Sequence, residues 1–272
     1  MSAKARTALT TGANSGLGLA TVIELAKRGH RSIGTVRSDA KAEVVRAAAR
    51  EAGVMVETVM LDVTDSEASE AVIDDVRPGI LVNNAGFMIY AAVEEVGDTD
   101  ASALLDTLVL APARLARLAV PHMRAAGWGR IIQVSSISAR TPFPLMGWYQ
   151  GAKMALEGVS DALRVEVASA GIGVSLIQPG LFRSELSGEM LEGDEPDDSP
   201  YADAYAQSRK LFRMAERFMS EPEDVAKVIG KVADARFPKA RYAVGADAQL
   251  NVLQSFVPTA IRDQAMRRGS GL

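Results

Sequence analysis

The stretch Arg6-Thr7-Ala8-Leu9-Thr10-Thr11-Gly12-Ala13-Asn14-Ser15-Gly16-Leu17-Gly18 decides the fold of this chain. Its first part, residues 6–10, is a short apolar run that breaks into a glycine-rich loop. Apolar residues then recur at helical spacing in Leu19, Val22, Ile23, Leu25 and Ala26, and Gly29 closes the segment. The pattern predicts a strand, a tight glycine loop and a helix.

The loop glycines are spaced Gly-x3-Gly-x-Gly, which differs from the common Gly-x-Gly-x2-Gly dinucleotide fingerprint. Glycine lets a backbone turn tightly and come close to a ligand, and the N-terminus of a helix attracts negative charge. Because this loop follows a strand and opens a helix, it is a candidate site for the pyrophosphate of a dinucleotide.

Strand-like and helical patterns alternate along the rest of the chain. Strands are expected at residues 31–36, 54–61, 80–82, 130–134, 172–177 and 242–244, and helices at residues 40–52, 100–126, 149–170 and 222–235. Asp39 is the expected N-cap of the helix at 40–52. The fold class is therefore α/β: a Rossmann-type, doubly wound parallel sheet of about seven strands between two layers of helices. Residues 1–272 are expected to form a single domain.

Composition excludes several kinds of function. The 272 residues are 48% hydrophobic and carry a net charge of −4, which gives no electrostatic case for nucleic acid or an anionic membrane. The chain has no cysteine and only two histidines, His30 and His122, both expected at the surface. We therefore expect no metal site and no serine protease-like triad. With no leader and no apolar run of ~20 residues, we expect a cytoplasmic protein.

Functional residues are expected where the strands end. The glycine loop, Arg37, Asp62, Asn83, Ser136 and Pro179-Gly180 all follow predicted strands. In a parallel sheet these carboxyl ends meet at one edge, and ligands bind beyond that edge. This convergence predicts a single site.

The end of the second strand indicates which cofactor is bound. A carboxylate there would hold ribose hydroxyls, but the position is Val36, and Arg37 follows it. An arginine accommodates the 2′-phosphate of NADP, so we favour NADP(H) over NAD(H). Asp62 and Val63 are candidates for contact with adenine; the alternative for Asp62 is a turn or a helix cap. The Asn83-Asn84 pair is interpreted first as a structural tie between loops and second as cofactor-lining.

Tyr149 and Lys153 lie four residues apart at the start of a helical pattern. Residues i and i+4 share one face of a helix, so the phenol and the ammonium point the same way. A nearby cation favours the phenolate and lowers the pKa of tyrosine, which suits a proton donor and acceptor. For the pair taken alone, a tyrosine and a lysine on a solvated helix face is the likelier explanation, and the case for catalysis depends on the rest of the chain.

Residues 184–221 interrupt the alternation with an acidic, proline-bearing run and an amphipathic stretch. The segment is either a disordered insert or, since it follows a cofactor strand, a lid over the substrate; we favour the lid. Apolar residues expected to border the pocket indicate an apolar substrate: Phe143, Leu145, Met146, Trp148, Phe182, Met190 and Leu191.

Taken together, these motifs resemble the short-chain dehydrogenase/reductase family in its shorter, single-domain branch. The resemblance rests on Thr11-Gly12-x3-Gly16-x-Gly18, Asn83-Asn84-Ala85-Gly86, Ser136, Tyr149-x3-Lys153 and Pro179-Gly180, in that order. It implies an NADP(H)-dependent oxidoreductase that transfers a hydride between the nicotinamide and a ketone or secondary alcohol. It also implies a homodimer or homotetramer, paired through the helices at residues 100–126 and 149–170.

The resemblance also implies the role of each residue. Tyr149 would be the acid/base, Ser136 would polarise the substrate oxygen, and Lys153 would bind the nicotinamide ribose and lower the pKa of Tyr149. The expected cofactor-binding residues are Gly12, Asn14, Ser15, Gly16, Leu17, Gly18, Arg37, Asp62, Val63, Asn84, Ala85, Gly86, Tyr149, Lys153, Pro179, Gly180 and Ser184.

One position departs from the family pattern. The family usually has an asparagine twenty-eight residues before the serine, and here that residue is Leu108. In the family its carbonyl holds a water of the proton relay and its side chain supports a helix irregularity. Leucine keeps only the carbonyl. The second hypothesis is therefore a catalytically impaired NADP-binding sensor or partner protein, although Ser136, Tyr149 and Lys153 favour the enzyme.

Overall fold

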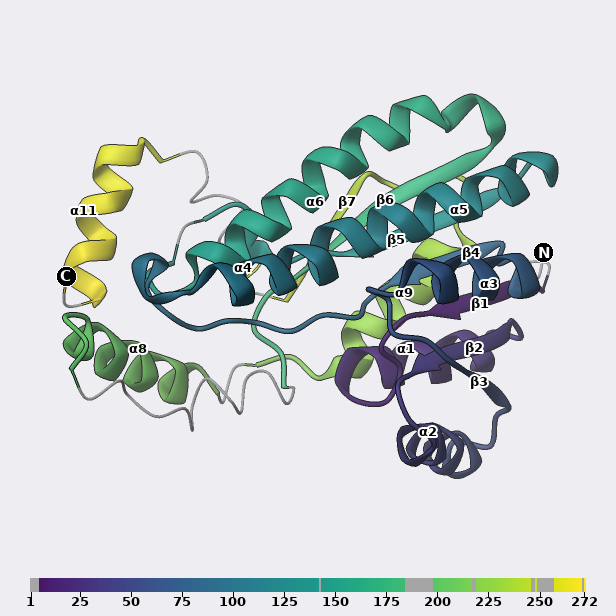
Figure 1. The fold of residues 1–272 in the computed structure, drawn as a ribbon, viewed down its shortest axis with the longest axis horizontal. Coiled ribbons are helices and arrows are strands. Elements are labelled where there is room, and N and C mark those ends of the chain that lie inside the picture. The colour runs from purple at the N-terminus through teal and green to yellow at the C-terminus, as the bar shows by residue number, and fades with distance from the viewer. Residues whose placement is uncertain are drawn as a thin grey trace.

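The computed structural model describes residues 5–141, 143–183, 198–216, 219–245, 248, 257–270 and 272. In this part of the chain, seven parallel strands form one sheet in the order β3-β2-β1-β4-β5-β6-β7, with helices on both faces (Figure 1). The strands are Thr7–Thr10, Arg31–Val36, Val56–Met60, Ile80–Asn83, Gly129–Val134, Ile172–Pro179 and Arg241–Val244. The expected doubly wound α/β fold is confirmed.

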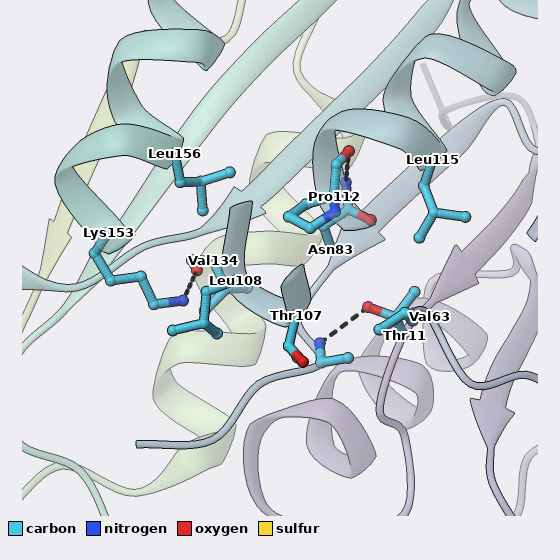
Figure 2. Close-up of a pocket in the computed structure, with 11 residues that line it drawn as sticks. Thr11, Val63, Asn83, Thr107, Leu108, Pro112, Leu115, Val134, Lys153 and Leu156 are labelled. Atoms are coloured by element: carbon cyan, nitrogen blue, oxygen red, sulfur yellow. Dashed lines mark hydrogen bonds between the residues drawn. The ribbon is translucent and has the colours of Figure 1, made fainter. Parts of the chain in front are cut away.

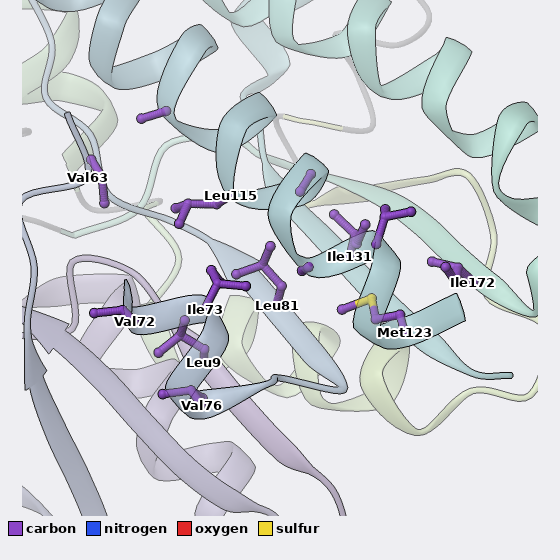
Figure 3. Close-up of a cluster of buried hydrophobic side chains, with 14 of the residues drawn as sticks. Leu9, Val63, Val72, Ile73, Val76, Leu81, Leu115, Met123, Ile131 and Ile172 are labelled. Carbon is purple, nitrogen blue, oxygen red and sulfur yellow. The ribbon is translucent and has the colours of Figure 1, made fainter. Parts of the chain in front are cut away.

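The helices form the two outer layers. One layer holds α1 (Gly16–Lys27), α2 (Asp39–Glu51) and α9 (Pro222–Asp234); the other holds α3 (Ser66–Val76), α4 (Asp98–Leu105), α5 (Ala111–Ala125) and α6 (Gly147–Glu166). Figure 3 shows the core beneath the second layer, where side chains of α3 and α5 pack on Leu9, Leu81 and Ile131 of the central strands. This burial on both faces accounts for the apolar runs of the strands.

The helix expected at residues 100–126 is interrupted. Between α4 and α5, residues Asp106–Leu110 form a π-helical turn with Leu108 at its centre. Turns of this kind are rare and often occur at functional sites. The irregularity that an asparagine supports in the family is therefore present here with a leucine.

Two local expectations were wrong. The N-cap of α2 is Ser38, whose hydroxyl accepts a hydrogen bond from the Lys41 amide at 3.3 Å, and Asp39 is the first helical residue. His30 is buried: its Nε2 lies 3.0 Å from Asp234 Oδ1, and its Nδ1 accepts from the Arg6 amide at 3.3 Å. The histidine thus joins the start of β2 to the end of α9.

The segment after β6 is described only in part. Residues 184–197 and 217–218, which include Ser184, Met190 and Leu191, lie outside the described residues. At the base of the segment, Phe182 forms a bridge with Ser220, and the Arg183 guanidinium lies 2.9 Å from Glu221. Further on are α8 (Ala202–Ala215) and α11 (Thr259–Ser270), which contact each other. Among the described residues, no helix is both long and apolar enough to cross a membrane.

Candidate active site

The glycine loop is packed so closely that side chains would not fit. Gly12 has φ +65°, and a Cβ added there would lie 2.9 Å from Ala85 Cα. A Cβ at Gly18 would lie 2.0 Å from the Gly12 carbonyl oxygen. Both glycines are therefore required by the path of the backbone, and they leave the N-terminus of α1 open to a ligand.

Side chains tie this loop to the end of β4. The Thr11 hydroxyl accepts hydrogen bonds from the Asn84 and Ala85 amides, both at 2.9 Å. Asn84 Nδ2 donates to the carbonyls of Thr11 and Gly12 at 3.0 and 3.2 Å, and Asn83 Nδ2 donates to Pro112 O and Gln133 Oε1. The interpretation of the two asparagines as structural ties is confirmed.

The ends of β2 and β3 form the next part of this edge. Val36 is buried and Arg37 is exposed, so the guanidinium is accessible. Asp62 Oδ1 accepts from the Thr64 amide and hydroxyl at 3.0 and 2.7 Å, and these bonds, with Arg37 nearby, lower the pKa of Asp62. Asp62 thus holds a turn, while Asp65 caps α3.

Ser136, Tyr149 and Lys153 come together from β5 and α6. Ser136 follows β5, and Tyr149 lies in the first turn of α6, where it interacts with the Ser136 hydroxyl. Lys153 is buried, its Nζ donates to the Val134 carbonyl at 2.8 Å, and it lies 5.7 Å from the centre of the Tyr149 ring. The predicted triad therefore shares one face of α6 and one strand end.

Burial shifts both ionisable groups toward their neutral forms. It raises the pKa of Tyr149 to about 12, although the Ser136 hydroxyl acts in the opposite direction. It lowers the pKa of Lys153 to about 8, opposed by the charge of Glu157. The expectation that Lys153 lowers the pKa of Tyr149 was wrong for this structure: burial of the phenol sets the direction of the shift, and the Ser136 hydroxyl is the group that opposes it.

Pro179 and Gly180 lie at the same edge. Pro179 ends β6, and the Gly180 amide donates to the Val244 carbonyl at 2.9 Å. A small cavity beneath the edge is lined by Thr11, Val63, Ala85, Leu108 and Lys153, among others (Figure 2). Its lining residues come from both the glycine-loop side and the lysine side of the site.

Leu108 fills the space that the π-helical turn creates. Its side chain is 1% exposed and packs in an apolar cluster with Leu104 and Ala152. A Cβ added at Gly86 would lie 2.7 Å from Leu108 Cδ2. Gly86 therefore makes room for the leucine.

The expected pocket-lining residues have mixed roles. Trp148 packs beside Tyr149, and its Nε1 donates to the Val93 carbonyl at 3.2 Å. Leu145 is buried against Tyr205 of α8, whereas Phe182 packs against the core beneath α9. Core packing thus accounts for part of the apolar set.

Sequence reasoning missed two supporting residues. Ser138 donates to Ser136 Oγ through its hydroxyl at 2.8 Å and its amide at 3.2 Å. Glu157, one turn after Lys153, accepts from Ser135 Oγ at 2.7 Å. The i, i+4 spacing from Lys153 to Glu157 was visible in the sequence, but the Ser138 contact depends on a loop conformation that spacing does not reveal.

These residues fit a dinucleotide. The loop needs glycine at two positions, the N-terminus of α1 faces the site, and a Ser-Tyr-Lys group lies at the adjacent strand end. This combination defines the class: a Rossmann-type protein that places a Ser-Tyr-Lys group beside a glycine loop at the N-terminus of a helix.

Comparison with known proteins gives the family. The model of the short chain dehydrogenase family matches residues 6–195. The chain is 32% identical to 3-ketodihydrosphingosine reductase of Bacteroides thetaiotaomicron, over 95% of this chain and 96% of that protein. The chain therefore belongs to the short-chain dehydrogenase/reductase family of oxidoreductases.

Solved structures agree with this family assignment. A short-chain dehydrogenase from Streptomyces avermitilis superposes with a TM-score of 0.79 at 31% identity, covering 96% of this chain and 94% of that one. L-sorbose reductase from Gluconobacter frateurii, complexed with NADPH and L-sorbose, has a TM-score of 0.76 at 31% identity, with 90% and 97% covered.

The packing of Leu108 leads to a prediction for Leu108→Asn. The substitution buries an amide in an apolar cluster, so we expect the free energy of unfolding to fall by about 2–4 kcal/mol. Turnover should change by less than about threefold, because the backbone carbonyl remains in place. Urea denaturation and steady-state kinetics measure the two effects.

The matched control is Leu110→Asn in the same π-helical turn, where the side chain is 53% exposed and the amide stays hydrated. It should cost well under 1 kcal/mol. A tenfold rate increase in a Leu108→Asn protein as stable as the parent would contradict the prediction.

Proposed function

We propose that the protein is an NADP(H)-dependent oxidoreductase that interconverts a ketone and a secondary alcohol. The observation that carries this proposal is the meeting of Ser136, Tyr149 and Lys153 at the strand edge that also holds the glycine loop. A bound nicotinamide supplies or accepts the hydride. The residues of the chain must then position the substrate oxygen and move one proton.

Tyr149 supplies that proton during reduction. With a pKa of about 12, the phenol stays protonated at neutral pH and can donate to an oxygen that becomes an alkoxide. In the reverse direction the same oxygen takes the proton back from the alcohol.

Ser136 is arranged to donate toward the substrate. Its Oγ accepts two hydrogen bonds from Ser138, so its own proton is left for the side where Tyr149 lies. A donor fixed in this way stabilises the developing negative charge without reorganisation. Lys153 has one N–H on the Val134 carbonyl and, in this proposal, uses another to hold the nicotinamide ribose.

A preference for NADP(H) is supported by the end of β2. Val36 offers no carboxylate to the ribose hydroxyls, and Arg37 is exposed beside it. A guanidinium pairs well with a phosphate. L-sorbose reductase, which the chain resembles, was solved with NADPH.

The second candidate function is a catalytically impaired, cofactor-binding sensor or partner protein, and only Leu108 favours it. The intact π-helical turn and the Ser136–Tyr149 contact favour catalysis. NADPH oxidation over a panel of carbonyl compounds separates the two, since cofactor binding is common to both.

We also propose that residues 184–221 act as a lid and that the substrate is apolar, supported by the packing of α8 against Leu145.

A homodimer or homotetramer is supported by the surface of α6. Met154, Val159 and Val165 are large apolar side chains that are 59%, 45% and 73% exposed. Exposed apolar residues gathered on one helix are typical of an interface.

The first prediction of the proposed function concerns Arg37→Ala. Removing the guanidinium should weaken NADPH binding by about tenfold or more and leave NADH binding within about twofold, because only NADPH has the 2′-phosphate. Fluorescence titration of both cofactors measures this. Arg46→Ala, an exposed arginine on α2 paired with Glu43, is the control. Equal affinity of the parent for both cofactors, or tighter NADH binding, would contradict the preference.

The second concerns Tyr149→Phe. The substitution removes only the proton-bearing oxygen, so turnover should fall by at least about 10²-fold while the dissociation constant for NADPH changes little. Single-turnover NADPH oxidation and a binding titration measure the two quantities. A variant that keeps most of its rate would rule out the acid/base role.

The third concerns assembly. Light scattering at micromolar concentration should give a dimer or tetramer mass, and Val165→Glu should lower that mass because it buries a charge in the interface. Val44→Glu on α2, at a side chain 48% exposed, is the control. A monomer mass for the parent would refute the prediction.

A further inference from the structure

A row of polar side chains continues along α6 beyond the catalytic pair. Tyr149, Lys153, Glu157 and Asp161 follow one another at four-residue intervals, which places them on one face. The chemistry proposed above uses only the first two. Glu157 is 8% exposed, and a carboxylate buried to that degree needs partners.

Glu157 has three partners, and each lies in, or directly after, a different strand. Its Oε1 accepts from Ser135 Oγ at 2.7 Å and from Gln178 Nε2 at 2.6 Å. Its Oε2 accepts from Arg241 Nε at 3.0 Å. Ser135 directly follows β5, Gln178 lies in β6, and Arg241 begins β7. One carboxylate therefore joins α6 to three neighbouring strands.

Two of these partners are next to residues of the site. Ser135 precedes Ser136, and Gln178 precedes Pro179. The hydrogen bonds to Glu157 therefore fix the backbone from which Ser136 projects and the strand end that borders the site. Since Glu157 is on the same helix as Tyr149, they also set the position of Tyr149 relative to Ser136.

Glu157 is also the negative charge that acts on Lys153. Lys153 is surrounded by Tyr149 and Glu157 on its own helix and by the Val134 carbonyl of β5. In its other side-chain contacts, Glu157 pairs with Arg241 of β7, which also lies 2.5 Å from Asp161. Arg140 donates to Gln178 Oε1 at 3.1 Å, and Gln178 in turn donates to Glu157. Burial lowers the pKa of Lys153 to about 8, and Glu157 opposes that effect.

We infer that Glu157 is a positioning residue, which holds α6 against the ends of β5 and β6 and supplies the negative charge that acts on Lys153. The inference rests on the proposed function only where it gives Lys153 a task in cofactor binding. The effect on the charge of Lys153 is a property of the free protein. It is tested without cofactor or substrate.

The test is an NMR titration of the lysine side chains in 13C-labelled free protein, with the Lys153 signal assigned by its loss in Lys153→Met. In Glu157→Gln, we expect the Lys153 midpoint to fall by about one pH unit, since the opposing charge is gone. Asp161→Asn is the matched control: it removes a carboxylate from the same helix face that also binds Arg241, and it should leave the midpoint within about 0.2 units.

Kinetics complete the experiment. In Glu157→Gln, kcat should fall by about tenfold, and the decline of kcat/KM at alkaline pH should begin about one unit lower, because Lys153 loses its proton earlier. Asp161→Asn should keep the parent profile. An unchanged Lys153 midpoint in a folded Glu157→Gln protein would overturn the inference.

Two further arms keep the test decisive. If Glu157→Gln does not fold, the titration is done on Glu157→Asp. Its shorter carboxylate should give a Lys153 midpoint between that of the parent and that expected without the charge. A Lys153 midpoint equal to that of the parent would overturn the inference. If the Lys153 midpoint moves as expected but no carbonyl compound is reduced by the parent, the proposed function fails and the charge effect of Glu157 stands.

Discussion

The close contact between the glycine loop and the end of β4 is the constraint on which the site depends. The Thr11 hydroxyl accepts hydrogen bonds from the backbone amides of Asn84 and Ala85, and the path of the loop leaves no room for a side chain at Gly12. Parallel pairing of β1 with β4 brings these segments to the same edge. The N-terminus of α1 is thereby held at the same edge as the strand end that leads to Ser136, so the glycine loop and the Ser136–Tyr149 contact lie in one site.

The π-helical turn shows that a local irregularity can persist when its usual supporting residue is replaced. Leu108 fills the turn with apolar contacts, and Gly86 provides the space for its side chain. Apolar packing supports the turn beside its backbone hydrogen bonds, because a buried leucine gains free energy in a volume in which an amide would need partners. The backbone of the turn, which carries the carbonyl of Leu108, keeps its irregular conformation.

The sequence was sufficient for the seven strands, for several of the helices that cover them and for the edge where the site lies, but it did not predict α3, α8 or α11. Periodicity fixed the strands to within a few residues, and the rule that ligands bind at strand carboxyl ends placed the predicted residues together. The sequence did not show which side chains from distant segments contact each other. His30 is separated from Asp234 by 204 residues, so its burial has no local signal. The N-cap of α2 was misplaced by one position because Ser38 and Asp39 are equally good caps.

The same limitation explains why the electrostatics of the site differ from expectation. Spacing places Lys153 beside Tyr149 and predicts mutual stabilisation of phenolate and ammonium, but it says nothing about burial. In the folded protein burial acts on both groups and favours the neutral phenol and the neutral amine. For Lys153, the charge of Glu157 opposes this effect of burial, and the pKa of about 8 leaves the lysine charged at neutral pH beside a protonated tyrosine. A neutral phenol can donate a proton to an oxygen that gains negative charge, and a nearby ammonium stabilises that charge, which is what the reductive half of the proposed reaction requires.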